Sequence, residues 1–150
     1  MPGIVVGVDG SDHSRRALGW AMREAVKHEL PLTVVSVHPP PPRPATRIYW
    51  GVHTAPDNSI DLEPARSAVQ EFVGKVAGEI GETPPEITVS VTVGDLAEEL
   101  VLASRDAYML VVGSRGSGGF ARLLMGSVSS QVVHHASCPV VVVPGPRQAS

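Results

Sequence analysis

The chain has 150 residues, of which 43% are hydrophobic and 18% charged, which suits one globular domain over residues 1–150. The formal net charge is −3 with no basic cluster and no apolar run of membrane-spanning length, which argues against a nucleic-acid or membrane partner. We expect a cytoplasmic protein, because no secretion signal opens the chain and Cys138 is the only cysteine.

The first third of the chain predicts strand, helix and strand. Residues 4–8 form a continuous apolar run, as in a strand buried on both faces of a parallel sheet. Ser11 is a plausible N-cap for the helix that follows and that ends before Pro31. Residues 32–37 predict the second strand. The first helix is expected to bury one apolar stripe: Ala17, Leu18, Ala21, Met22, Ala25 and Val26.

Residues 38–60 lack a periodic pattern. The run His38–Pro44 predicts polyproline II, either as a stiff surface connection or as a ligand for a proline-binding module. The irregular stretch 45–60 is long enough to act as a flap. Tyr49 and Trp50 would then cover an adenine or, alternatively, only pack onto the domain.

The middle of the chain predicts a second helix, an edge strand and a third helix. Asp61 is expected to cap the second helix, and Gly81 to end it; its core face is Ala65, Val69, Phe72, Val73, Val76 and Ile80. Residues 87–93 alternate apolar and polar, as near a sheet edge. Asp95 and Glu98 form a capping box for a short helix that turns Leu96, Leu100 and Val101 inward.

The last third begins with an apolar strand, residues 108–112, followed by the glycine-rich segment 113–129. A fourth helix starts near Ser127, with Val128, Val132, Val133 and Ala136 at helical spacing, and a strand follows at residues 140–143. Residues 145–150 read as a disordered tail. This alternation of five strands and four main helices predicts an α/β doubly wound fold with a parallel sheet covered on both faces.

The glycine-rich segment predicts either a phosphate cradle or an ordinary surface loop with a Ser N-cap. Glycines allow close approach to the backbone, and the unpaired N–H groups at the start of the fourth helix favour an anion. A Walker A motif is excluded because no lysine follows Lys75. A dinucleotide fingerprint matches Gly116, Gly118 and Ala121 but lacks the strand just before it and the acidic residue about twenty positions later.

A third pattern fits in full. Gly113-x-x-Gly116, nine residues and then Gly126-Ser127 resemble the ATP-binding signature of the universal stress protein family. Residues 4–11 and 136–144 resemble the family's first and last strands. The resemblance implies a Rossmann-like, adenine nucleotide alpha hydrolase-like sheet of order 3-2-1-4-5. Strand order would then reverse between the strands that end at Asp9 and Gly113, where such folds bind ligands.

The resemblance also implies a site for ATP, taken up with Mg²⁺. Asp9 would bind near the ribose, Val37 would meet adenine through its backbone, and Val112 and Gly113 would line base and sugar. The phosphates would lie against five residues: Gly116, Gly126, Ser127, Val128 and Ser129. A carboxylate such as Asp9 accepts from ribose hydroxyls, but needs a cation between it and phosphate.

Three functions follow from these observations. The first is a nucleotide-dependent regulatory or stress-response protein, the second a slow ATPase or adenylate-handling enzyme, and the third a family member that has lost nucleotide binding. No catalytic set is evident, and the histidines lack metal-site spacing. His13 and His38 are expected at the rim of the site as surface or hydrogen-bonded residues. The resemblance further implies a homodimer through residues 140–143; the alternative is an edge covered within its own subunit.

Overall fold

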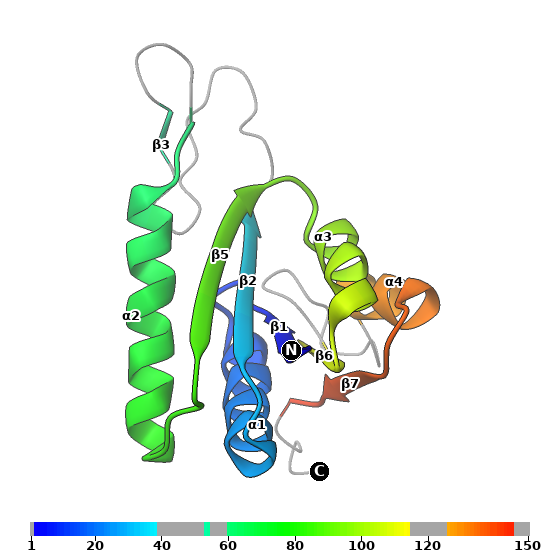
Figure 1. Cartoon of the computed structure of the whole chain (residues 1–150). Coiled ribbons are helices and arrows are strands. Elements are labelled where there is room, and N and C mark those ends of the chain that lie inside the picture. The colour runs from blue at the N-terminus through cyan, green and yellow to red at the C-terminus, as the bar shows by residue number, and fades with distance from the viewer. Residues whose placement is uncertain (1, 39–52, 55–59, 115–125, 146–150) are drawn as a thin grey trace, which may run out of the picture.

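Five parallel strands form the central sheet in the order β5-β2-β1-β6-β7 (Figure 1). Numbered along the chain, these five strands lie in the order 3-2-1-4-5, so the predicted fold class and strand order are confirmed. The strands are β1 Ile4–Gly7, β2 Leu32–His38, β5 Ile87–Val93, β6 Met109–Gly113 and β7 Val140–Val143.

The computed structural model describes residues 2–38, 53–54, 60–114 and 126–145. Several predictions therefore concern residues outside the described part of the chain. These are the polyproline run after His38, the flap with Tyr49 and Trp50, Gly116 in the glycine-rich segment, and the tail at 146–150.

Two helices cover each face of the sheet. Helices α1 (Asp12–His28) and α2 (Glu63–Ile80) pack together on one face, while α3 (Leu96–Ala103) and α4 (Ser127–His135) pack together on the other (Figure 1). A 3₁₀ turn, Ser104–Asp106, follows α3. The central strand β1 consequently buries both of its faces, which is why it is apolar at successive positions and buried throughout.

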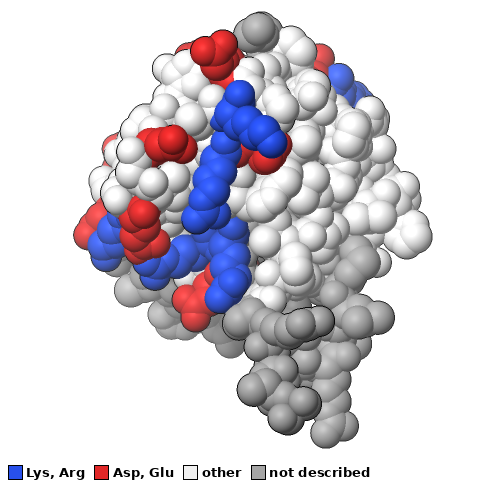
Figure 2. Space-filling model, turned by 90° about the horizontal axis from the view of Figure 1, so that it is seen from below, with Lys and Arg blue, Asp and Glu red and all other residues white. Residues whose placement is uncertain are grey.

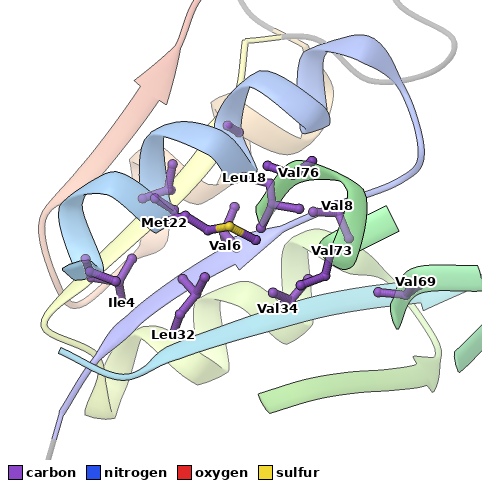
Figure 3. Close-up of a cluster of buried hydrophobic side chains, with 14 of the residues drawn as sticks. Ile4, Val6, Val8, Leu18, Met22, Leu32, Val34, Val69, Val73 and Val76 are labelled. Carbon is purple, nitrogen blue, oxygen red and sulfur yellow. The ribbon is translucent and has the colours of Figure 1, made fainter. Parts of the chain in front are cut away.

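The core is divided by the sheet into two clusters. The larger one joins β1 and β2 to α1 and α2, and Figure 3 shows Leu18 and Met22 of α1 reaching toward Val34 and Val73. The smaller one lies under α3 and α4 and includes Val5, Leu110 and Val132. Burial of apolar surface at about 25 cal/mol per Å² makes these clusters the main source of stability.

Most predicted apolar stripes are confirmed, with three exceptions. Val26 is only half-buried, and Val133 of α4 is 46% exposed although its spacing matched the buried Val132. In α3 the residue turned inward beside Leu100 is Ala97, whereas Val101 is half-buried. Helices α3 and α4 have only eight and nine residues, so a one-position error in phase changes which side chain is buried, whereas Val26 lies in the last turn of the longer α1.

Predicted helix caps are confirmed at Ser11 and Asp95. Ser11 Oγ accepts from the backbone N–H of Ser14 at 3.2 Å, and an Asp95 carboxylate oxygen accepts from that of Glu98 at 3.0 Å. Gly81 ends α2 in the left-handed region, with φ of 78°. Helix α1 ends the same way, but at Glu29 rather than a glycine.

The region before α2 differs from its prediction. Strands β3 (His53–Thr54) and β4 (Ile60–Asp61) pair antiparallel, where the sequence predicted no regular structure. Asp61 accepts from the N–H of Glu63 at 3.0 Å, but the N-cap position itself belongs to Leu62. Asp61 therefore accepts from the first turn of α2, but it does so from the residue before the N-cap and not from the N-cap position that the sequence predicted.

Candidate functional site

The carboxyl ends of β1, β2 and β6 meet at one edge of the sheet. Ile4 of β1 is level with Leu32 of β2 and with Met109 of β6, and all three strands run in the same direction. Strand order reverses at β1, because β2 and β5 lie on one side of it and β6 and β7 on the other. The structure thus brings Val8–Asp9, Val37–His38 and Val112–Gly113 to the edge where such sheets bind ligands.

Asp9 lies in the turn between β1 and α1. Its Oδ1 accepts from the backbone N–H of Ser11 at 2.9 Å, which holds the carboxylate at the carboxyl end of β1. Gly10, between Asp9 and Ser11, has a φ of 86°, a backbone conformation that residues with a Cβ rarely adopt. Helix α1 starts immediately after this turn.

Gly113 is required by packing. A Cβ on Gly113 would lie 2.9 Å from the carbonyl oxygen of His13 and 3.0 Å from its carbonyl carbon. The first turn of α1 therefore passes directly over the end of β6, and only a residue without a side chain fits between them. The family resemblance implies that Gly113 lines the base and sugar of a ligand, and the structure shows that it also packs against His13.

The start of α4 provides unpaired backbone donors. Gly126 is the N-cap, with φ of −80° and ψ of 174°, and its N–H donates to the carbonyl of Ser114. The first intrahelical bond is made by Ser130, whose N–H donates to the Gly126 carbonyl at 3.0 Å. Within the part of the chain that the structure describes, the N–H groups of residues 127–129 meet no acceptor. They therefore remain available to an anion.

Ser129 uses its hydroxyl for hydrogen bonds within the protein. Its side chain is 1% exposed, and its Oγ donates to the carbonyls of Ser114 at 3.2 Å and Gly126 at 3.1 Å. Ser114 also donates its N–H to the carbonyl of Val143 at 3.0 Å. The two serines thus join the ends of β6 and β7 to the start of α4. A phosphate contact from Ser129 would come from its backbone N–H.

The two site valines use their side chains in the core. Val112 is 3% exposed and, like the half-buried Val37, belongs to the cluster under α3 and α4. Only their backbone atoms face along the strand-end edge. The predicted role of Val37, a backbone contact, is compatible with this packing.

His38 is the feature of this edge that the sequence did not predict. It ends β2 and is 1% exposed, and its Nε2 is buried without a hydrogen-bond partner among the described residues, as is the hydroxyl of Ser36 two residues earlier. Burial lowers the pKa of His38, because the charged imidazolium loses its hydration. Its alternation with Ser36 and Val34 puts it on the face covered by α1 and α2. No periodic pattern could have indicated this burial next to a run of prolines.

The described ranges contain neither a cluster of metal-ligating side chains nor a membrane-spanning helix. No three His, Cys, Asp or Glu side chains gather there as a metal site. No helix in these ranges is both long and apolar enough to cross a bilayer.

Comparison with known proteins gives one consistent family. The model of the Universal stress protein family matches residues 2–144. A universal stress protein of Mycolicibacterium smegmatis is 39% identical over 151 residues, which is 99% of this chain and 50% of the relative. The chain therefore spans about half the length of the curated relatives it matches.

Solved structures show the same fold. A universal stress protein UspA from Lactobacillus plantarum superposes with a TM-score of 0.70 at 21% identity, covering 95% of this chain and 97% of the other. A universal stress protein in complex with cAMP superposes with a TM-score of 0.66 at 26% identity, covering 95% of both chains. That relative binds an adenine nucleotide.

Proposed function

The chain belongs to the universal stress protein family, and from this premise we propose that it binds an adenine nucleotide, ATP with Mg²⁺, and acts as a nucleotide-dependent regulatory protein in a stress response. The proposed site lies at the carboxyl edge of the sheet between β1 and β6. Its residues are those named from the sequence: Asp9, Val37, Val112, Gly113, Gly116, Gly126, Ser127, Val128 and Ser129.

The observation that carries the proposal is the start of α4. Three consecutive backbone N–H groups, those of residues 127–129, have no acceptor in the described residues, and the positive end of the helix dipole lies there. Gly126 precedes them without a side chain that would block an approaching phosphate. A relative of the same fold with 26% identity is solved with cAMP, which supports an adenine nucleotide as the class of ligand.

Asp9 supports the ribose end of the proposed site. Its carboxylate is fixed by the Ser11 N–H at the end of β1, and ribose hydroxyls are the donors that a carboxylate accepts from. Mg²⁺ would neutralise the phosphates and reduce their repulsion from this carboxylate. We therefore expect the metal to arrive with the nucleotide.

Regulation is favoured over catalysis because the described residues around the start of α4 include no evident base or charge clamp. His38, at the end of β2, is buried with a lowered pKa on the α1 and α2 face. A slow ATPase or adenylate-handling enzyme on this fold is the alternative. We propose the cytoplasm as its compartment, since Cys138 has no second cysteine to pair with in the chain.

We propose a homodimer that forms through β7. This strand is at the end of the sheet order, and Val140–Val143 are all half-buried in the isolated chain. An edge strand has unpaired backbone groups, and pairing with its copy across a two-fold axis would satisfy them.

The test is titration calorimetry with AMP, ADP and ATP, each with and without Mg²⁺. We expect saturable binding to the parent protein and its loss in Gly126→Val, where a branched side chain covers the start of α4. The backbone of Gly126 is in the extended region, so valine fits there without a strained φ. Absence of binding to the parent at millimolar nucleotide would refute the proposal. Nucleotide turnover by the parent that Gly126→Val abolishes would favour the enzyme.

A further inference from the structure

A groove of about 1020 Å³ runs along α1 and reaches His13 and Ser114 near the end of β6. It lies between the end of α2, at Val76 and Ile80, and the end of β7, at Val143 and Pro144. Gly19 makes room for it, since a Cβ there would come within 4.0 Å only of the tips of Val76, Ile80 and Arg23. Nothing in the proposed nucleotide function accounts for this groove.

Positive charge gathers at the groove although the whole chain is acidic. Helix α1 carries four of the seven Lys and Arg in the described residues: Arg15, Arg16, Arg23 and Lys27. Seen from below, where α1 lies in Figure 1, Lys and Arg atoms form one band with Asp and Glu atoms beside it (Figure 2). The first three of these side chains line the groove.

Only one of the three groove arginines has an acidic partner among the described residues. Arg15 pairs with Glu79 of α2, across the junction of the two helices. Arg16 and Arg23 are exposed and form no ion pair with the described residues. Two guanidinium groups in a concave surface are therefore left for an external carboxylate or phosphate, which guanidinium binds with two parallel hydrogen bonds.

The spacing of Arg16 and Arg23 indicates which kind of chain would fit the groove. Arg16, Trp20 and Arg23 are four and three residues apart, so they share one face of α1 with the half-buried indole between the two charges. The two arginines are seven residues apart, a rise of about 10 Å at 1.5 Å per residue. In a polyproline II chain, side chains three positions apart lie on one side and about 9 Å apart.

We propose that this groove docks an extended acidic segment of a partner protein. Two carboxylates three positions apart would bind Arg16 and Arg23, and an apolar side chain near them would pack on Trp20. A nucleic acid fits less well, because Asp12 and Glu79 also line the groove and the net charge of the chain is −3. The volume is at the upper end of small-molecule pockets, which run to about 1,000 Å³. The docking site uses Arg16, Trp20 and Arg23, none of which belongs to the proposed nucleotide site, although Ser114 at the other end of the groove accepts from the N–H of Gly126.

The test uses the full chain, labelled with ¹⁵N, and the synthetic peptide acetyl-Ser-Glu-Leu-Pro-Glu-Ser-amide. We expect saturable changes in the NMR signals of the Trp20 indole, the arginine Nε–H groups and the last turn of α2. A permuted peptide of the same composition, acetyl-Ser-Glu-Glu-Pro-Leu-Ser-amide, keeps the charge and loses the spacing. It should bind several-fold more weakly.

The double variant Arg16→Gln/Arg23→Gln should weaken peptide binding by about tenfold, since two exposed charge pairs contribute up to about 1 kcal/mol each. Its matched control is Lys75→Gln/Arg105→Gln, which removes the same charge outside the groove and should bind as the parent does. Equal binding of both peptides, or equal loss in both double variants, would overturn the proposal. So would tighter binding of an oligothymidylate through the same residues, which would assign the groove to nucleic acid. Thermal unfolding of each variant checks that it folds.

Discussion

The contact between Gly113 and His13 makes a sharp prediction for the substitution Gly113→Ala. The added methyl would lie 2.9 Å from the His13 carbonyl oxygen, 3.0 Å from its carbonyl carbon and 3.2 Å from its Cβ. None of these atoms is the flexible end of a side chain, so either the first turn of α1 or the end of β6 must move. Overpacking of this kind costs about 1–3 kcal/mol.

The matched control is the same substitution at Gly74. This glycine is in the middle of α2, is exposed, and a Cβ there would meet nothing within 4 Å. Alanine in a helix interior is favoured over glycine by about 0.5–1 kcal/mol, because glycine loses more backbone entropy on folding. The two variants should therefore shift stability in opposite directions although their chemistry is identical.

Both variants can be measured by thermal unfolding followed by far-UV circular dichroism. A domain of this size shifts its midpoint by roughly 2–4 °C per kcal/mol. For a cost of about 2 kcal/mol, Gly113→Ala should lower the midpoint by about 4–8 °C, and Gly74→Ala should raise it slightly. A Gly113→Ala protein as stable as its parent would refute the close contact between α1 and β6. Destabilisation of both variants to the same extent would show a general intolerance of alanine.

Three further predictions concern the core, a cap and pH. Leu18→Ala should lower the free energy of unfolding in urea by about 2–5 kcal/mol, because this side chain is fully buried; a loss below that of a surface variant would contradict the packing. Asp95→Ala should cost about 1 kcal/mol by the same measurement and Asp95→Asn less, because both Asp and Asn can accept from the Glu98 N–H; equal costs would exclude the cap. Below pH 6.5 the unfolded state binds a proton at His38 that the native state resists, so stability should fall as pH decreases toward the lowered native pKa. His38→Phe should make the pH profile of unfolding flatter, and an unchanged profile would show that His38 titrates alike in both states.

The order and type of the elements follow from local sequence. Hydrophobic periodicity separates strands from helices, as in the continuous run of β1 and the stripe of α1. Caps such as Ser11 and Asp95 are equally local, because each side chain bonds a backbone N–H three residues away. The strand order came from the family resemblance, because pairing between strands is not encoded in the period of any one of them.

Other features depend on segments that are distant in the sequence. Gly113 meets His13 a hundred residues earlier, and Ser129 turns its hydroxyl to Ser114 instead of the crevice. The basic groove exists because α2 and β7 flank the Arg16, Trp20 and Arg23 face of α1. Composition showed only an acidic chain and no basic cluster, since charges that are spread over a helix gather on one side only when it folds.

The sequence by itself determined which segments are strands and helices and where several of them begin and end, and it predicted a glycine-rich candidate site before the fourth helix. Only the tertiary structure decided that His38 is buried, that the Ser129 hydroxyl bonds within the protein, and that a groove carries two arginines with no ion pair among the described residues. The physical reason is range: hydrogen bonds and apolar stripes within one element act over a few residues, whereas burial and charge pairing depend on neighbours that only the folded chain brings together.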